Sequence, residues 1–306
     1  MIKPLRLRVG DRVALVAPAS PFDAEDLSEG VKELAQLGFE AVYDERVRER
    51  MPFVAGSAQT RAAIIEQAWR DPSIRAVIAI RGGYGSAHLL PLLDTTLLRE
   101  ARKIFVGYSD ITALLCLHLQ HHVVCFHGAM IERRLARGAE GYDRHSFLAA
   151  LTRDAPVGEL TPPGIDVIKP GEARGPLVGG TLTQLASLLG TPWAYMPPDN
   201  CILFIEDIAE RPYRLDRMLT QLSQAGVLDK AAALVFGEFP GCAEPDAEIT
   251  AKTVIESVAH AFRGPVLFGF PSGHTRGATW TLPFGVDARV ITSPTPALVI
   301  EEAAVE

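Results

Sequence analysis

Residues 105–111, Phe-Val-Gly-Tyr-Ser-Asp-Ile, are the stretch around which the chain is organised. A short apolar run ends at Gly107, Ser109 follows, and residues 111–117 have a helix-compatible composition. This order predicts a strand, a sharp turn and a helix. On such a turn the serine hydroxyl lies above the edge of the sheet, where the first N–H groups of the helix point at the group that it attacks. Ser109 is therefore a candidate nucleophile.

Ser109 also has a simpler interpretation. Its match to the hydrolase elbow Gly-x-Ser-x-Gly is partial, because Ile111 stands where the second glycine belongs. A serine between a strand and a helix often serves only as the N-cap of that helix. The rest of the chain has to distinguish a nucleophile from a cap.

Strands and helices alternate in the first part of the chain. Runs that predict a strand or a helix follow one another at 12–20, 26–37, 39–43, 60–70 and 76–80. This alternation predicts right-handed crossovers and a parallel sheet, which is an α/β fold with its ligand sites beyond the carboxyl ends of the strands. We assign residues 1–150 to this N-terminal domain, and Ser109 lies at one of its strand ends.

The chain changes character after residue 150. Residues 151–174 are rich in proline and glycine with only short apolar pairs, and they are predicted to be a linker. Residues 175–306 are predicted to form a second domain. Near its end, 279–286 and 288–291 have the pattern of a β-hairpin.

Two predicted strands of the second domain lead into polar side chains. Residues 201–205 run into Glu206 and Asp207, and 266–270 run into a glycine-bracketed turn that presents His274. In the order nucleophile, acid, base, Ser109, Glu206 and His274 follow the hydrolase triads. His274 would take the proton of the serine, and Glu206 would hold the imidazole in the right tautomer. The simpler alternative is a pair of surface acids and an ordinary turn histidine.

A glycine-rich loop, Arg-Gly-Gly-Tyr-Gly at 81–85, follows the strand at 76–80. Its spacing differs from Gly-x-Gly-x-x-Gly, and neither Lys-Ser nor Lys-Thr follows, so a dinucleotide or phosphate loop is disfavoured. It can form an oxyanion hole, in which a glycine N–H acts together with the N–H of Asp110, or it can be a flexible turn. We prefer the oxyanion hole because Ser109 lies one βα unit downstream.

The composition excludes other classes of protein. A net charge of −7, from 30 basic and 37 acidic residues, argues against a nucleic-acid surface. No apolar run is long enough to span a bilayer, and no signal-peptide core follows the N-terminus, so a cytoplasmic location is expected. The four cysteines have no Cys-x-x-Cys spacing and are expected to be reduced. His118, His121 and His122 could share a helical face and bind a metal, but a structural role is preferred.

Several of these motifs together resemble the LD-carboxypeptidase family of serine peptidases, the muramoyl-tetrapeptide carboxypeptidases, of which the microcin C immunity peptidases are a branch. The motifs are Arg-Gly-Gly-Tyr-Gly at 81–85, Gly-Tyr-Ser-Asp at 107–110, Gly-Gly-Thr-Leu at 179–182, Leu-Ala-Ser-Leu-Leu-Gly-Thr-Pro at 185–192, Ile-Glu-Asp at 205–207, Pro-Tyr-Arg-Leu-Asp-Arg-Met-Leu at 212–219 and Gly-His-Thr at 273–275. They occur in family order and cover nearly the whole chain.

The resemblance implies a triad of Ser109, Glu206 and His274, and an oxyanion hole from the N–H groups of Gly83 and Asp110. It implies a Rossmann-like N-terminal domain, a β-rich C-terminal domain, an active site in the cleft between them, and a homodimer. The implied reaction needs neither metal nor cofactor and removes the terminal D-alanine of cytoplasmic murein tetrapeptides in cell-wall recycling. Residues 193–196 fall where the family varies, so the branch of the family stays open.

Other functions remain to be weighed against this one. A two-domain protein that binds a small molecule without chemistry would use the same glycine loop and cleft. A glutamine amidotransferase would have a cysteine in place of Ser109. Arg81 is a candidate for binding the terminal carboxylate of a peptide, since arginine pairs with a carboxylate in a bidentate way. Its alternative is a structural salt bridge, with Asp110 as a suggested partner.

Overall fold

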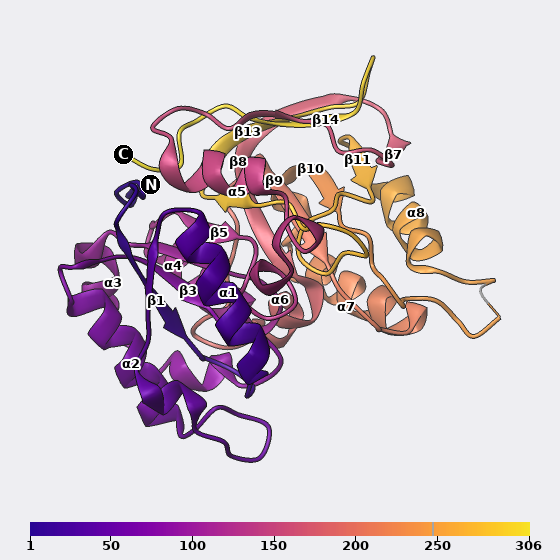
Figure 1. The fold of residues 1–306 in the computed structure, drawn as a ribbon. Coiled ribbons are helices and arrows are strands. Elements are labelled where there is room, and N and C mark those ends of the chain that lie inside the picture. Colours follow the sequence, from indigo (N-terminus) through magenta and orange to yellow (C-terminus); the bar gives the residue numbers. More distant parts are fainter. Residues whose placement is uncertain (247) are drawn as a thin grey trace.

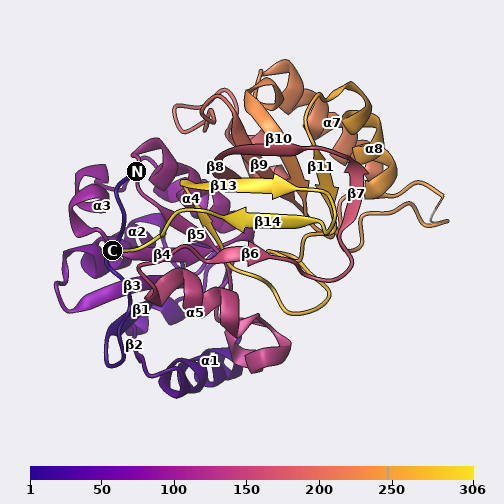
Figure 2. The ribbon, with the colours of Figure 1, turned by 90° about the horizontal axis from the view of Figure 1, so that it is seen from above.

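The computed structural model describes residues 1–246 and 248–306, and the strands of this part form two sheets. In Figure 1 the N-terminal elements, indigo to magenta, lie on one side of the molecule and the orange elements lie on the other, and Figure 2 separates the same two groups from above. The predicted α/β fold, with a parallel-sheet N-terminal part and a β-rich C-terminal part, is confirmed.

The first sheet and its helices consist of β1 (Arg12–Val16), α1 (Ala24–Gln36), β2 (Glu40–Val42), α2 (Ala58–Arg70), β3 (Ile74–Ala79), α3 (Thr95–Ala101), β4 (Ile104–Gly107), α4 (Thr112–Gln120), β5 (Cys125–His127), α5 (Arg144–Thr152) and β12 (Leu282–Phe284). In the described chain its strand order is β12-β5-β4-β3-β1-β2. The strands β1 to β5 are parallel, and β12 is antiparallel to β5.

The second sheet and its helices consist of β6 (Gly158–Leu160), β7 (Asp166–Lys169), β8 (Glu172–Thr181), α6 (Leu182–Leu188), β9 (Cys201–Glu206), α7 (Pro212–Gln224), β10 (Ala231–Phe236), α8 (Ala251–Ala261), β11 (Val266–Phe268), β13 (Val286–Ile291) and β14 (Ala297–Ile300). Its strand order in the described residues is β6-β14-β13-β8-β9-β10-β11-β7. The parallel core β8-β9-β10-β11 is flanked by antiparallel strands on both sides.

Helix α4 joins the two halves. It packs against β4 and β5 of the first sheet and against β8 and α6 of the second. Every residue from Thr112 to Leu119 is buried, which explains why this helix has no polar face. The hydroxyl of Thr112 accepts a hydrogen bond from the N–H of Thr181 at 3.1 Å. The helix that follows Ser109 is therefore fixed to the end of β8.

Two predictions about the second half were wrong. Part of the predicted linker at 151–174 is sheet. The short strands β6 and β7 form the two opposite edges of the second sheet, and β8 begins at Glu172. Prolines and glycines lie around these strands, where a short edge tolerates them. The hairpin predicted at 279–291 does not form either, since β12 pairs with β5 while β13 pairs with β8 and β14. Gly285, with φ of +92°, turns the chain from one sheet to the other.

The end of the chain also returns to the first half. The N–H of Arg6 donates to the carbonyl of Glu306 at 2.9 Å, and the N–H of Glu306 donates to the carbonyl of Pro4 at 2.9 Å. Both views place the N and C labels close together (Figures 1 and 2). Residues 175–306 thus supply a strand and the terminus to the N-terminal half.

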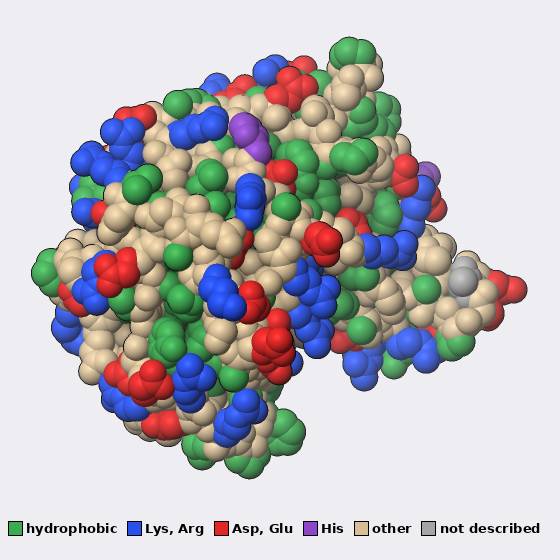
Figure 3. All heavy atoms as spheres, viewed as in Figure 1, with side chains coloured by type: hydrophobic (Ala, Val, Ile, Leu, Met, Phe, Trp, Pro, Cys, Tyr) green, Lys and Arg blue, Asp and Glu red, His purple; other side chains and the backbone are tan. Residues whose placement is uncertain are grey.

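The surface is of mixed charge. On the face in Figure 3, lysine and arginine side chains are interspersed with aspartate and glutamate side chains, and they do not gather into a patch of one sign. Within residues 1–246 and 248–306, no helix has the length and apolar character that crossing a membrane requires.

Candidate active site

Ser109 lies on a strained turn between β4 and α4. Its φ is +64°, a backbone conformation that is uncommon outside glycine and that often marks functional sites. Residues Ser109–Ile111 form one turn of 3₁₀-helix before α4 begins. A Cβ at Gly107 would lie 2.5 Å from Cγ2 of Ile111, so the turn folds tightly over this glycine. The predicted strand, turn and helix are all present.

The glycine loop lies directly against Ser109. A Cβ at Gly82 would be 2.8 Å from the Cβ of Ser109 and 3.0 Å from its Oγ, and 3.4 Å from the nitrogen of Asp110. Gly83 follows with φ of +102° and packs on Ser20. Only residues without a side chain allow this approach.

Ser20 orders this loop and was missed in the sequence. Its N–H donates to the carbonyl of Gly82 at 3.1 Å, and its Oγ accepts from the N–H of Tyr84 at 3.0 Å. The hydroxyl itself donates to the carbonyl of Phe53 at 2.8 Å. The sequence does place Ser20 at the end of the first predicted strand. A small residue at this position lies beside the end of the neighbouring strand, where the glycine loop begins.

The carboxylate of Asp110 accepts hydrogen bonds from two other segments of the chain. Its Oδ2 accepts from the N–H of Ser86 at 2.7 Å, and its Oδ1 accepts from Nε2 of Gln184 at 3.1 Å. The carboxylate is buried, with 3% of the residue exposed. These bonds fix the peptide that follows Ser109.

Glu206 and His274 are in direct contact. Oε2 of Glu206 lies 2.7 Å from Nδ1 of His274 and accepts from its backbone N–H at 2.9 Å, while Oε1 accepts from the hydroxyl of Thr181. Burial acts to raise the pKa of Glu206, but His274 and His127 outweigh it and hold the pKa well below its usual range. Burial acts to lower the pKa of His274, but the Glu206 charge outweighs it and raises the pKa above its usual value.

Tyr108 and Arg134 place the His274 turn against the Ser109 turn. The rings of Tyr108 and His274 meet edge to face with centroids 5.0 Å apart. The guanidinium of Arg134 donates to the hydroxyl of Tyr108 at 3.1 Å and to the carbonyls of Gly273 and Thr275 at 3.0 and 3.1 Å. Sequence reasoning missed Arg134, because no motif surrounds it.

The structure therefore brings Glu206 and His274 into contact, and Tyr108 packs the turn that bears Ser109 against the His274 turn. Among the hydrogen bonds of the described residues, none involves the hydroxyl of Ser109, so it is not bonded to His274. Such bonds are often long in free enzymes and shorten when substrate binds. Chemically, the arrangement offers a serine on a turn that packs against a histidine, and a buried carboxylate holds Nδ1 of that histidine.

Comparison with known proteins decides the family. Residues 13–128 match the LD-carboxypeptidase N-terminal domain, and residues 174–290 match the LD-carboxypeptidase C-terminal domain. The chain belongs to the LD-carboxypeptidase family. The resemblance found in the sequence motifs is confirmed, and the chain is a member of a family of peptidases.

Two relatives carry substrate names. The chain is 34% identical over 307 residues to a probable murein peptide carboxypeptidase of Bacillus subtilis, covering 97% of this chain and 94% of the relative. It is 31% identical over 294 residues to the murein tetrapeptide carboxypeptidase of Pseudomonas aeruginosa, covering 92% and 93%.

Two solved structures are similar. The muramoyltetrapeptide carboxypeptidase of Oxalobacter formigenes is 32% identical, with a TM-score of 0.83 over 95% of this chain and 99% of that chain. The microcin C7 self-immunity protein MccF has a TM-score of 0.91 over the whole of both chains at 23% identity, which is a likeness of fold alone.

In this LD-carboxypeptidase fold Asp207 bonds Thr183 and Ile208 and not His274. Its Oδ2 accepts from the N–H and the hydroxyl of Thr183 at 2.8 and 2.7 Å, and its Oδ1 accepts from the N–H of Ile208 at 2.8 Å. Burial, together with the charge of Glu206, raises the pKa of Asp207 to about 6. Of the two acids at the end of β9, one bonds His274 and the other holds the first turn of α6.

Arg81 is bound to the scaffold on one side. Its NH1 donates to the carbonyl of Pro21 at 2.8 Å, and its Nε lies 3.4 Å from a carboxylate oxygen of Glu132. The suggested salt bridge with Asp110 was wrong, since Glu132 is the partner. The side chain is 40% exposed, so part of it remains open to solvent.

The histidines of the alternative metal cluster, His118, His121 and His122, do not form a metal site in the described residues. His118 is buried in α4, stacks on Phe105 with centroids 4.5 Å apart, and bonds the carbonyl of Leu114 through Nδ1 at 2.7 Å. His121 lies beyond the last residue of the helix. Across the described ranges of the chain, no group of three or more histidine, cysteine, aspartate or glutamate side chains is placed to hold a metal.

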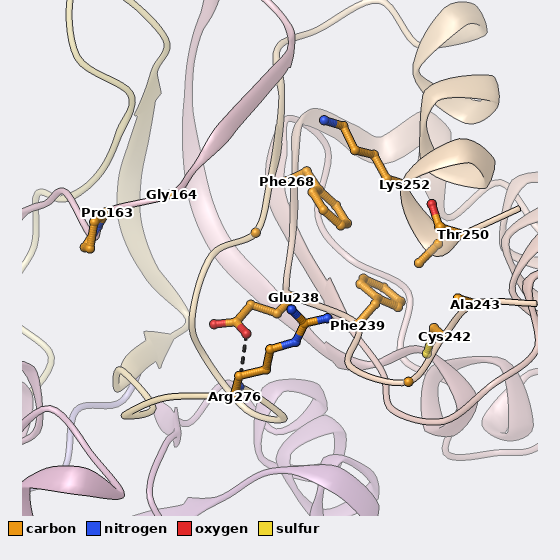
Figure 4. A pocket seen from close by; sticks show the side chains of 13 residues that line it. Pro163, Gly164, Glu238, Phe239, Cys242, Ala243, Thr250, Lys252, Phe268 and Arg276 are labelled. Atoms are coloured by element: carbon orange, nitrogen blue, oxygen red, sulfur yellow. Dashed lines mark hydrogen bonds between the residues drawn. The ribbon is translucent and has the colours of Figure 1, made fainter. Parts of the chain in front are cut away.

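A pocket of about 440 Å³ is lined in part by Arg276, two residues after His274. Figure 4 shows it between Phe239 and Phe268, with Lys252 at one rim and Arg276 at the other. The backbone N–H of Arg276 donates to the carboxylate of Glu238 at 3.0 Å, the bond dashed in Figure 4. This bond fixes the chain two residues after His274.

Proposed function

We propose that this protein is a serine carboxypeptidase that hydrolyses the L,D bond before the terminal D-alanine of murein tetrapeptides. The observation that carries the proposal is the contact of 2.7 Å between His274 and the buried Glu206, next to the turn that bears Ser109. The murein substrate is supported by the names of relatives that are 31 and 34% identical over more than nine-tenths of the chain.

The contact to Glu206 defines the role of His274. Because Nδ1–H donates a hydrogen bond to the Glu206 carboxylate, the neutral ring has a free lone pair on Nε2. That nitrogen accepts the proton of Ser109 as the serine oxygen attacks the scissile carbonyl carbon. The histidine then gives this proton to the amine of the departing D-alanine. Water, deprotonated by the same nitrogen, hydrolyses the ester and restores the serine.

The oxyanion of each tetrahedral intermediate would be held by the N–H groups of Gly83 and Asp110. Support comes from Gly82, whose close approach to Ser109 and to the nitrogen of Asp110 brings the loop and the elbow together. Ser20 on one side and Ser86 on the other fix the two segments in advance. Donors that are already oriented stabilise the developing charge without reorganisation.

Arg81 is proposed to meet the carboxylate of the terminal D-alanine. It directly precedes Gly82 in the chain, and its side chain is partly exposed while Glu132 and Pro21 orient it. A carboxypeptidase has to recognise a free carboxylate, which an arginine binds through two parallel hydrogen bonds.

The setting of the reaction is also a proposal. The family resemblance supports murein recycling in the cytoplasm and a homodimeric enzyme that needs no cofactor. The charge of −7 argues against a nucleic acid as partner.

The function is tested by offering two substrates to the purified protein. One is a murein tetrapeptide, and the other is aspartyl sulfamoyl adenosine, the molecule bound to MccF in one solved structure. Mass spectrometry should detect free D-alanine and the murein tripeptide, with the sulfamoyl adenosine intact. Cleavage of the nucleotide analogue without release of D-alanine would instead assign the protein to the microcin immunity branch.

A further inference from the structure

His127 is a fully buried histidine that the proposed mechanism does not use. It is the last residue of β5, and its side chain has no exposed surface. Its ring is enclosed by Phe204, Phe284 and Tyr108, with centroids 5.1, 5.4 and 5.9 Å away. Imidazole nitrogens in so apolar a cage need partners inside the protein.

The first ring nitrogen has a partner that defines its proton. Nδ1 of His127 lies 2.9 Å from Oγ of Ser272, and this hydroxyl lies 2.8 Å from the carbonyl of Trp280. A carbonyl only accepts, so the single hydroxyl proton of Ser272 goes to Trp280. The serine oxygen must then accept from His127, and Nδ1 carries a proton.

The second ring nitrogen faces the catalytic acid. Nε2 is without a hydrogen-bond partner in the described residues, and it lies 3.8 Å from Oε1 of Glu206, which is itself fully buried. If Nε2 carried only a lone pair, that lone pair would face a buried carboxylate, which is repulsive. A proton on Nε2 converts the same geometry into an attraction between opposite charges.

We propose that His127 is a positioning residue that carries a proton on both nitrogens and pairs its positive charge with Glu206. The carboxylate is then held between two histidines, with His274 on Oε2 and His127 facing Oε1 beside the hydroxyl of Thr181. Glycine at position 273 allows His127 and Glu206 to lie this close to the backbone, because a Cβ there would be 2.7 Å from Cδ of Glu206 and 2.7 Å from Cε1 of His127.

The charge on His127 has a consequence for the proposed function, on which this part of the inference rests. The ionisable groups around Glu206 include His127, His274, Asp207, Cys242 and Tyr108, with Arg134 behind Tyr108. A positive His127 offsets part of the attraction that Glu206 exerts on the protonated form of His274. It thereby keeps more of His274 neutral, the form that accepts the proton of Ser109.

The protonation state is tested directly by nitrogen NMR of histidine-labelled wild-type protein at pH 7. His118 is an internal reference, because it is also buried and burial lowers its pKa to about 4, so that it is neutral. We expect two protonated nitrogens for His127 and one for His118. The signals of His127 are assigned by their loss in His127→Gln. If His127→Gln does not fold, Ser272→Ala assigns them instead, because it removes the partner of Nδ1 and should shift the signal of that nitrogen alone. An unprotonated Nε2 on His127 at pH 7 would overturn the proposal. This readout needs no substrate, so it stands apart from the test of the proposed function.

The role is tested by the pH profile of kcat/KM for D-alanine release. Glutamine keeps an N–H donor near Oε1 but carries no charge, so His127→Gln should shift the acid limb upward by about half a pH unit or more. His118→Gln, the matched substitution of a buried histidine away from Glu206, should leave the limb in place. If His127→Gln lowers kcat/KM at every pH without shifting the acid limb, His127 contributes only packing, and the proposed charge on His127 is contradicted.

Discussion

Oε2 of Glu206 accepts two hydrogen bonds from His274, one from Nδ1 at 2.7 Å and one from the backbone N–H at 2.9 Å. The first bond sets which ring nitrogen carries the proton, and the second ties the carboxylate to the peptide of the turn. Rotation of the His274 ring would break its hydrogen bond to a buried, charged carboxylate, while the backbone bond keeps that carboxylate in place. The orientation of the proposed base is thus fixed before substrate arrives.

This pairing predicts the acid limb of the activity profile. Protonated His274 cannot accept the proton of Ser109, so activity is lost as pH falls through its pKa. Glu206 raises that pKa above the usual 6.5. We therefore expect the acid limb of kcat/KM, which reports on the free enzyme, to have its midpoint above pH 6.5. A midpoint below this value would remove His274 from the role of base.

Replacing Glu206 by glutamine should lower both the rate and this midpoint. The amide has no charge to favour protonated His274, and it can present a donor where Nδ1–H needs an acceptor. We expect kcat to fall by about 10²–10⁴-fold, less than on loss of the nucleophile. The acid limb should move down in pH, opposite to the shift expected for His127→Gln. Unchanged kinetics in Glu206→Gln would contradict the triad.

Gly82→Ala tests the approach of the glycine loop to the elbow. The new methyl group would lie 2.8 Å from the Cβ of Ser109 and 3.0 Å from its Oγ, so either the loop or the serine has to move. A misplacement of this size can cost about 100-fold in kcat/KM. Gly277→Ala is the matched control, since a Cβ there meets nothing within 4 Å. Equal activity of the two variants would show that the loop takes no part in the site.

The sequence predicted those features that depend on strand ends. Ser109, Glu206 and His274 were chosen as candidates because each follows an apolar run, and ligand sites lie beyond the carboxyl ends of parallel strands. Ser109 follows β4 of the first sheet, whereas Glu206 ends β9 and His274 lies in the turn after β11, both in the second sheet. The shared position of the two acids, by contrast, gave no sign that Asp207 would bond Thr183 instead of a histidine.

Residues that act across the two halves could not be predicted from the sequence. Arg134 bonds carbonyls about 140 positions away, and His127 meets Ser272 and Glu206 only because β5 and β9 end side by side. No local pattern marks such pairs. The edge strands β6 and β7 were missed for another reason. Strands of three and four residues among prolines and glycines are too short to show the alternation of apolar and polar side chains that marks a strand.

Arg81→Lys separates recognition of the substrate from support of the site. Lysine keeps the charge but loses the bidentate geometry, so KM for the tetrapeptide should rise much more than kcat falls. A C-terminally amidated analogue lacks the carboxylate and should be affected little by the substitution. If both substrates lose activity equally, Arg81 serves the scaffold through Glu132 and Pro21, and the proposed contact is wrong.

The central claim is that Ser109 releases the terminal D-alanine of a murein tetrapeptide, and its most direct test compares three proteins by mass spectrometry of the products. They are the wild type, Ser109→Ala and the control Ser187→Ala, in which an exposed hydroxyl of α6 bonded to the carbonyl of Thr183 is removed. Wild type and control should give D-alanine and tripeptide at equal rates, while Ser109→Ala, folded by circular dichroism, should be slower by about 10⁴-fold or more. Turnover of the tetrapeptide by Ser109→Ala at near the wild-type rate would contradict the account.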